Sequence, residues 1–288
     1  MSRRNWLLFL LVGFLWGVPY MFIRIAVRDF SPASIVFARV LIGAAILLPI
    51  AWRQGGLKAA IVGYKYVFLY ALTEMIGPFF LITKAETAIS SGLTGLLVAT
   101  VPIWSTIFAS FWGDKSVWHH KRLLGMVIGL IGVFLLVGIE SFSGNSAFWA
   151  FACVLAASIG YGFAVNMVIR KLPHVSGIAV NGLAMAMTAI FYAPFAMTQW
   201  PRHSVSINAA FSLLALGTLC TAAAFIVLFA IVDEIGAARA SLVTYLNTAF
   251  AVILGVLILK EPFTLGIAVG LPLVLIGSYF ASRKPKVS

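Results

Sequence analysis

A charged side chain interrupts each of two long apolar runs in this sequence. Arg39 lies within the run 33–52, and Glu74 lies within the run 66–83. Ionisable groups in such runs face the interior of a helix bundle, where they bind substrates or protons or pair with one another. At 1.5 Å per residue of helix, their backbones differ in depth by about 7 Å, which two extended side chains can span. Two hypotheses stay open: an Arg39–Glu74 ion pair that ties two helices together, and a substrate or proton role for either group.

Aromatic and polar side chains also recur near the middle of several apolar runs. The candidate binding residues are, in chain order, Trp16, Tyr20, Glu74, Pro78, Thr100, Tyr161, Asn166, Thr244, Tyr245 and Asn247. Aromatic rings with a few amides and hydroxyls suit an amphipathic zwitterion of moderate size, and prolines free backbone groups that a cavity can use. The alternative is structural, with Trp and Tyr in belts at the membrane surface and single Asn or Thr residues tying helices together.

Residues that could do catalytic chemistry are poorly placed. The four histidines, His119, His120, His174 and His203, fall in loops or at the ends of apolar runs. Cys153 and Cys220 both lie inside apolar runs and form no CxxC motif. The sequence has no GxxxxGK[ST] phosphate loop. We therefore expect no enzyme activity, no metal and no cofactor, and we expect any transport to proceed without ATP hydrolysis by this chain.

The composition defines the environment in which these residues act. Of 288 residues, 62% are hydrophobic and 10% are charged, against about 25% charged in an ordinary soluble domain. A soluble protein of this size could not bury that much apolar surface, which excludes a soluble enzyme, a disordered chain and a disulfide scaffold. The net charge of +12 comes from short basic clusters between apolar runs, as in the loops of membrane proteins, so nucleic acid is not an expected partner.

The apolar runs predict an all-α integral membrane protein with ten transmembrane helices, since about 20 apolar residues span a bilayer. The predicted spans are 5–23, 33–52, 66–83, 87–113, 123–139, 141–169, 172–201, 203–232, 240–259 and 262–282. The first run follows Arg3 and Arg4, but no small-residue cleavage site closes it. We therefore interpret it as a retained helix and not as a signal peptide.

The distribution of Lys and Arg predicts the orientation, because cytoplasmic loops are enriched in basic residues. With the N-terminus in the cytoplasm, the inner side holds Arg3, Arg4, Arg53, Lys58, Lys65, Lys115, Lys121, Arg122, Arg170, Lys171, Arg239, Arg283, Lys284 and Lys286. The outer side holds Arg24, Arg28, Lys84, Arg202 and Lys260. This asymmetry predicts that both termini are cytoplasmic.

The two halves of the chain, 1–142 and 143–288, resemble each other. LWGVPYMFIR from Leu15 matches GYGFAVNMVIR from Gly160, so that Trp16-Gly17 corresponds to Tyr161-Gly162. GxxxG pairs recur at matched positions, Gly125 with Gly129 and Gly266 with Gly270, and such pairs allow close helix contact. Two successive repeats of five helices must enter the membrane from opposite sides. The prediction is an inverted repeat around a central cavity, an arrangement that suits alternating access.

These motifs resemble the drug/metabolite transporter superfamily, EamA type. The resemblance is carried by LWG from Leu15, VPIW from Val101 and LGVLILKEPFTLGIAVGLPLVLIGSYF from Leu254, and it covers nearly the whole chain. Its most specific part is Glu261-Pro262 at a helix junction, whereas in the first half Gly113-Asp114 is followed by Lys115. The resemblance implies ten helices, a central cavity and export of metabolites or amino acids. The aromatic-rich first half is similar to bacterial exporters of aromatic amino acids, the YddG type.

The combined prediction is a secondary transporter in the bacterial inner membrane that exports amino acids, aromatic or other neutral ones, or related metabolites. Its partners are then a small-molecule substrate and the lipid bilayer, and the sequence does not define the oligomeric state. Two alternatives stay open: a membrane-embedded enzyme acting on lipid, and an exporter of unrelated drugs or metabolites. The enzyme alternative requires a nucleophile or metal cluster near one membrane surface, which the sequence does not offer.

Overall fold

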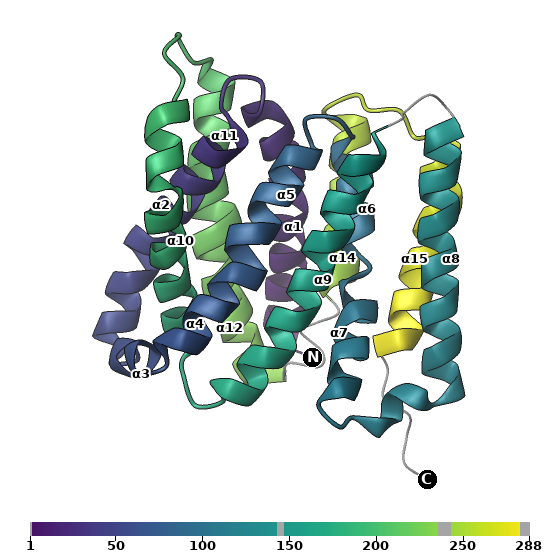
Figure 1. Cartoon of the computed structure of the whole chain (residues 1–288), viewed down its shortest axis with the longest axis horizontal. Helices are drawn as coiled ribbons and strands as arrows, with labels where there is room; N and C mark the ends of the chain where they lie inside the picture. The colour runs from purple at the N-terminus through teal and green to yellow at the C-terminus, as the bar shows by residue number, and fades with distance from the viewer. Residues whose placement is uncertain (1, 143–146, 236–242, 283–288) are drawn as a thin grey trace.

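The computed structural model describes residues 2–142, 147–235 and 243–282, and within these ranges the chain is helical, without strands (Figure 1). The helices of the first half are α1 (Arg3–Ala26), α2 (Pro32–Arg53), α3 (Leu57–Val62), α4 (Tyr64–Ala71), η1 (Leu72–Ile76), α5 (Gly77–Ala85), α6 (Ser91–Val98), α7 (Val101–Phe111), η2 (Lys115–Trp118) and α8 (His120–Phe142). Those of the second half are α9 (Phe148–Lys171), α10 (Gly177–Gln199), α11 (Ile207–Gly217), η3 (Thr218–Ala223), α12 (Ala224–Ile235), α14 (Val243–Leu257) and α15 (Leu265–Ser282). The all-helical class expected from the sequence is confirmed for the described residues.

Among the described residues, eight helical segments are long and apolar enough to cross a membrane. The last two expected spans, 240–259 and 262–282, appear as the shorter apolar helices Val243–Leu257 and Leu265–Ala281. Residues 236–242, which include the start of the ninth expected span and Arg239, lie outside the described residues, as do Arg283, Lys284 and Lys286. The expected boundary at 142/143 also adjoins a stretch outside them.

Serine caps define where several of these helices begin. Ser31, Ser90 and Ser206 precede α2, α6 and α11, and each hydroxyl accepts a hydrogen bond from the backbone N–H three residues later. These bonds satisfy donors that the first helical turn leaves without a partner. The short connections that carry these serines hold consecutive spans side by side.

Three spans are interrupted near their middle. The third span, Tyr64–Ala85, contains the π-helical turn η1, and the eighth, Ile207–Val232, contains the π-helical turn η3. The fourth span breaks at Ala99 and Thr100, just before Pro102, whose missing N–H and fixed ring disfavour a continuous helix. Such interruptions re-aim side chains and often occur at functional sites.

The helix packing places a central group of spans between two lateral pairs. α8 packs against α15 at one edge of the molecule, and α2 packs against α10 at the opposite edge (Figure 1). Between them, α1 packs against α14, α11 and α12, and α9 packs against α5 and α7. The central spans are those in which the sequence places most of its aromatic and polar candidates.

Glycines set the spacing of α8 and α15. A Cβ atom added to Gly277 would lie 2.2 Å from the backbone N of Gly129, and one added to Gly125 would lie 2.6 Å from the N of Ala281. The second GxxxG pair behaves alike, since a Cβ on Gly270 would lie 2.9 Å from the Cβ of Leu136. The prediction that these glycines allow close helix contact is confirmed.

Candidate functional site

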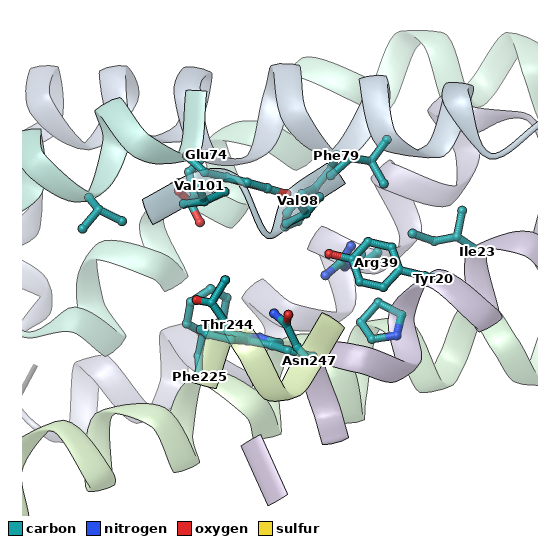
Figure 2. A pocket seen from close by; sticks show the side chains of 15 residues that line it. Tyr20, Ile23, Arg39, Glu74, Phe79, Val98, Val101, Phe225, Thr244 and Asn247 are labelled. Atoms are coloured by element: carbon teal, nitrogen blue, oxygen red, sulfur yellow. The ribbon is translucent and has the colours of Figure 1, made fainter. Parts of the chain in front are cut away.

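A cavity of about 190 Å³ lies at the centre of the bundle, between residues of α1, α2, the third and fourth spans, α9, α12 and α14 (Figure 2). It is lined by Trp16, Pro19, Tyr20, Ile23, Arg39, Glu74, Phe79, Ile82, Val98, Val101, Tyr161, Val165, Phe225, Thr244 and Asn247. Seven of these are sequence-predicted site residues: Trp16, Tyr20, Arg39, Glu74, Tyr161, Thr244 and Asn247. Residues from both halves of the chain therefore meet in one cavity.

Arg39 of α2 supplies the cation of the cavity, although its side chain is 9% exposed. Its Nε atom donates a hydrogen bond of 2.8 Å to the hydroxyl of Thr221 in η3. Its Cζ atom lies 4.0 Å from the centre of the Phe79 ring, a cation–π distance. The two Nη atoms have no hydrogen-bond partner in the described part of the chain. The guanidinium is thus anchored at one edge, and its other donors are left for a ligand.

Glu74 of η1 supplies the carboxyl group of the cavity. Its Oε2 atom is buried and has no hydrogen-bond partner among the described residues. The first of the two hypotheses, an ion pair between Glu74 and Arg39, does not hold, because their side-chain N and O atoms do not approach within 4.0 Å. The ion pairs within the described ranges are Arg4–Glu234 and Arg122–Asp114. The physical reason is that Arg39 is held by Thr221 and Phe79 instead. Figure 2 shows Arg39 and Glu74 reaching the same cavity from separate parts of its wall.

Aromatic rings form much of the remaining wall. The rings of Trp16 and Phe225 meet edge to face at 5.7 Å between centroids. Tyr20 and Phe79 are each 6% exposed, so their rings are fixed by the surrounding core. Tyr161 contributes a ring from α9, at the position that the sequence match pairs with Trp16. Rings held in this way can stack on or meet the edge of an aromatic or apolar ligand.

Two polar side chains of α14 complete the wall. Asn247 is 7% exposed, and its Oδ1 atom accepts a hydrogen bond of 3.2 Å from the hydroxyl of Thr248. Its amide nitrogen has no partner in the described part of the chain. Thr244 lies one helical turn earlier and also lines the cavity. α14 therefore presents a donor and a hydroxyl on the face directed to the cavity.

Four predicted site residues do not line the cavity. Asn166 donates to the backbone O and the Oγ of Ser105, at 2.9 and 2.8 Å, and so ties α9 to α7. Thr100 accepts a hydrogen bond of 3.2 Å from the indole of Trp104 within its own span. The Tyr245 ring meets the Tyr279 ring at 6.3 Å between centroids, and Pro78 is buried in the first turn of α5. For these four, the structural alternative describes the contacts better than cavity lining does.

Sequence reasoning missed the apolar half of the wall. The added lining residues are Ile23, Phe79, Ile82, Val98, Val101, Val165 and Phe225. Phe79 is distinguished only by the structure, in which the centre of its ring lies 4.0 Å from the Cζ atom of Arg39. The others are apolar residues in apolar helices, and composition does not separate a cavity wall from a lipid face.

The residues that line the two ends of the cavity differ in exposure. Ile23 and Ile82 are 1% and 4% exposed, whereas Val165 is 43% exposed. Trp16, Glu74 and Tyr161 are also partly exposed. Along α1, the buried residue Ile23 is farther from the start of the helix than Trp16 is. The more buried end of the cavity, at Ile23 and Ile82, is thus the end opposite to the start of α1, and it is called the sealed end below.

A family comparison identifies the type of protein that holds this cavity. The model of the EamA-like transporter family matches the chain twice, over residues 4–138 and 147–283. The chain belongs to this family. As an EamA-like transporter it is a multi-pass membrane protein, and the recognition made from its motifs is confirmed at the level of the family.

Two relatives that are named as transporters agree with this assignment, and one solved structure shares the fold. "Uncharacterized transporter YoaV" of Bacillus subtilis is 27% identical over 284 residues, covering 95% of this chain and 96% of YoaV. "Uncharacterized inner membrane transporter YedA" of Escherichia coli is 27% identical, covering 95% of this chain and 91% of YedA. A crystal structure with 18% identity matches 98% of both chains with a TM-score of 0.63, a likeness that shows the fold alone.

Proposed function

We propose that this EamA-like transporter exports a neutral amino acid, or a closely related amphipathic metabolite, by alternating access and without ATP hydrolysis. One observation carries the proposal: the cavity joins a guanidinium, a carboxyl group and several aromatic rings, and its two ionisable side chains are not paired with each other. A ligand that completes these contacts carries a carboxylate, an ammonium group and an apolar side chain. α-Amino acids have this combination.

The carboxylate binds to Arg39. The Nε atom of Arg39 already donates to the hydroxyl of Thr221, so the guanidinium plane is fixed before the ligand binds. The remaining Nη donors form charge-assisted hydrogen bonds with a carboxylate, and these are among the strongest that a protein makes. A site whose donor is held in place in advance loses less conformational entropy on binding.

The ammonium group binds to Glu74, and the apolar side chain lies among the rings. Glu74 has a buried oxygen without a partner, which an ammonium donor would satisfy. Trp16, Tyr20 and Tyr161 offer ring faces and edges in the same cavity. Each aromatic contact contributes about 0.5–1.5 kcal/mol, which favours aromatic over small polar substrates.

The chain is built as two inverted repeats, 1–142 and 143–288, of five helices each. The family model supports this part of the proposal, because it matches each half separately. A matched pair of contacts also supports it. A Cβ on Gly17 would lie 2.4 Å from the Cβ of Phe250, and one on Gly162 would lie 2.7 Å from the Cβ of Trp104. The π-helical turns η1 and η3 occur in the third span of each half. Such repeats give a fold two arrangements, each open to one side.

Both termini are cytoplasmic, and the cavity is closed toward the outside. The charge asymmetry of the loops supports this orientation. The start of α1 and the end of α15 lie toward the same edge of the molecule (Figure 1). Ile23, in the last turn of α1, lies at the other end of that helix. The described arrangement is then inward-facing, which is the state in which an exporter collects its substrate.

Binding of three related compounds to the purified protein tests this function. Phenylalanine has both charged groups, 3-phenylpropionate lacks the ammonium group, and 2-phenylethylamine lacks the carboxylate. We expect phenylalanine to bind best to the wild type. Arg39→Gln should weaken the binding of phenylalanine and 3-phenylpropionate but not that of 2-phenylethylamine. Glu74→Gln should weaken the binding of phenylalanine and 2-phenylethylamine but not that of 3-phenylpropionate. Equal losses for all three compounds in both variants would contradict recognition of an amino acid and favour an unrelated metabolite.

A further inference from the structure

Glu86 is a buried carboxyl group that the proposed binding site does not use. It follows the last residue of α5 as its C-cap, and it is 0% exposed. Neither of its carboxyl oxygens has a hydrogen-bond partner in the described part of the chain. A carboxylate buried without partners carries a severe desolvation penalty, so such a group takes up a proton instead.

The neighbours of Glu86 do not neutralise a charge on it. Arg24 of α1 donates from Nη1 to the backbone O of Glu86 and not to its carboxyl group. Glu261, in the connection from α14 to α15, accepts hydrogen bonds from the N and Oγ of Ser91 at 2.9 and 2.8 Å, and from the N of Gly92 at 3.2 Å. Glu261 is therefore satisfied by the start of α6 and repels a second charge nearby.

The titratable groups around Glu86 come from three other parts of the chain. They are Tyr20 and Arg24 on α1, Arg39 on α2, and Glu261. Burial raises the pKa of Glu86 well above its usual range, and the charge of Glu261 raises it further, while Arg24 and Arg39 oppose the shift. The net direction favours the neutral form.

Glu86 lies next to the sealed end of the cavity, because its backbone N donates to the O of Ile82 at 3.0 Å and its backbone O accepts from Arg24, the residue after Ile23. Ile23, Ile82, Ile89 and Leu93 are 1%, 4%, 1% and 2% exposed and belong to one apolar cluster. Glu86 stands between Ile82 and Ile89 in the sequence, at the junction of α5 with the turn before α6. Opening of this end separates these residues and admits water to the Glu86 carboxyl group.

We infer that Glu86 is a proton-binding latch: closure of the sealed end takes up one proton on Glu86, and opening releases it to the water on that side. The inference rests on the alternating access proposed above but not on the identity of the substrate. At pH below the ordinary range of a glutamate, both states hold the proton and pH has no effect. Above that range closure requires proton uptake, so a rising pH favours the open state until the closed state also loses its proton.

The accessibility of a cysteine in the seal tests this inference without any transport assay. Ile89→Cys is made in the full chain with Cys153 and Cys220 replaced by alanine, and an impermeant thiol reagent is added outside intact cells over a range of external pH. The rates are divided by those of Asn208→Cys, an exposed position at the start of α11, to remove the titration of the thiol itself. The normalised rate should rise with pH, by at most about tenfold per pH unit, the limit for one linked proton.

Two variants separate the latch from a general pH effect. Glu86→Gln mimics the protonated group, so the rate should be low and independent of pH. Glu234→Gln removes an exposed carboxyl group that pairs with Arg4, and it should keep the wild-type profile. A flat profile in the wild type, a pH response that survives in Glu86→Gln, or a response to sodium instead of pH would overturn the inference.

An infrared measurement covers the case in which Glu86→Gln does not fold. The wild type labelled with ¹³C-glutamate should show an isotope-shifted band of protonated carboxyl groups, and a part of this band should be lost as the Ile89→Cys rate rises. A band that stays unchanged while the accessibility changes would also overturn the latch. Loss of phenylalanine binding would leave both measurements intact, so failure of the proposed substrate is distinguishable from failure of the latch.

Discussion

The Nε atom of Arg39 in α2 donates a hydrogen bond of 2.8 Å to the hydroxyl of Thr221 in the π-helical turn of the eighth span. This bond joins the first half of the chain to the second behind the wall of the cavity. Thr221 also donates to the backbone O of Leu216 at 2.7 Å, so its hydroxyl is held in one orientation. The position of the guanidinium therefore depends on the interrupted helix across from it.

Thr221→Val tests this dependence while keeping the size of the side chain. We expect phenylalanine to bind at least tenfold more weakly, because a hydrogen bond to a charged group contributes about 1.5–3 kcal/mol. The matched control is Thr218→Val in the same turn, whose hydroxyl bonds only to the backbone O of Leu214 in the described structure. Titration calorimetry on both variants measures the effect. Equal affinities in the two variants would contradict an orienting role for Thr221.

The aromatic wall predicts a difference between substrates. Trp16→Ala and Tyr161→Ala should each reduce phenylalanine export by roughly 2- to 12-fold, and threonine export less, because a ring contributes about 0.5–1.5 kcal/mol to an aromatic contact. Tyr245→Ala is the control, since its ring packs on Tyr279 and does not line the cavity. Export of both amino acids is measured from cells with matched protein yield. An equal loss for both substrates would assign Trp16 and Tyr161 to gating or packing.

The glycines of α1 and α9 predict a packing effect that is independent of the substrate. Gly17→Ala and Gly162→Ala force a methyl group against Phe250 and Trp104, at 2.4 and 2.7 Å between Cβ atoms. We expect each to destabilise the fold by about 1–3 kcal/mol, as overpacking does. Gly138→Ala in α8 is the control, because nothing lies within 4 Å of its added Cβ. Thermal unfolding in detergent compares the three, and an unchanged Tm in all of them would refute close contact at these glycines.

The sequence predicted the helical class and the central residues because both depend on simple properties. Apolar runs of span length identify membrane helices. Trp16 and Tyr161 were found because the repeat places them at matched positions, and both line the cavity. Arg39 and Glu74 were found because charge is rare in such runs. These signals can be recognised in the sequence without knowledge of how the helices pack.

The remaining contacts depend on helix rotation and on partners far away in the sequence. Arg39 bonds to Thr221, which lies 182 residues further along the chain, and the ion pair with Glu74 that one hypothesis proposed does not form. Asn166 faces Ser105 of α7, and Tyr245 faces Tyr279 of α15, although both lie within a few residues of cavity-lining positions. A rotation of one residue, about 100°, decides between the cavity and a neighbouring helix.

Asp29 predicts a measurable pH effect outside the membrane segments. It follows α1 and accepts hydrogen bonds from the N and Oγ of Ser206, which lower its pKa. The ionised form is the bonded one, so this contact is present above the ordinary pKa of an aspartate and is lost as pH falls through the lowered value. Ser206→Ala should return the pKa toward its usual range. NMR of ¹³C-aspartate-labelled protein measures this shift, and an unchanged titration in Ser206→Ala would show that the Ser206 hydroxyl is not its cause.

Counterflow of labelled phenylalanine tests the central claim most directly. Proteoliposomes that hold the full chain are loaded with unlabelled phenylalanine, and uptake of external label is followed with methionine and threonine in parallel. We predict transient accumulation of phenylalanine above equilibrium, weaker accumulation of methionine and threonine, and loss of all three in Arg39→Gln at equal protein content. Absence of accumulation for every amino acid in wild-type liposomes, or equal accumulation in Arg39→Gln, would contradict amino-acid transport through this cavity.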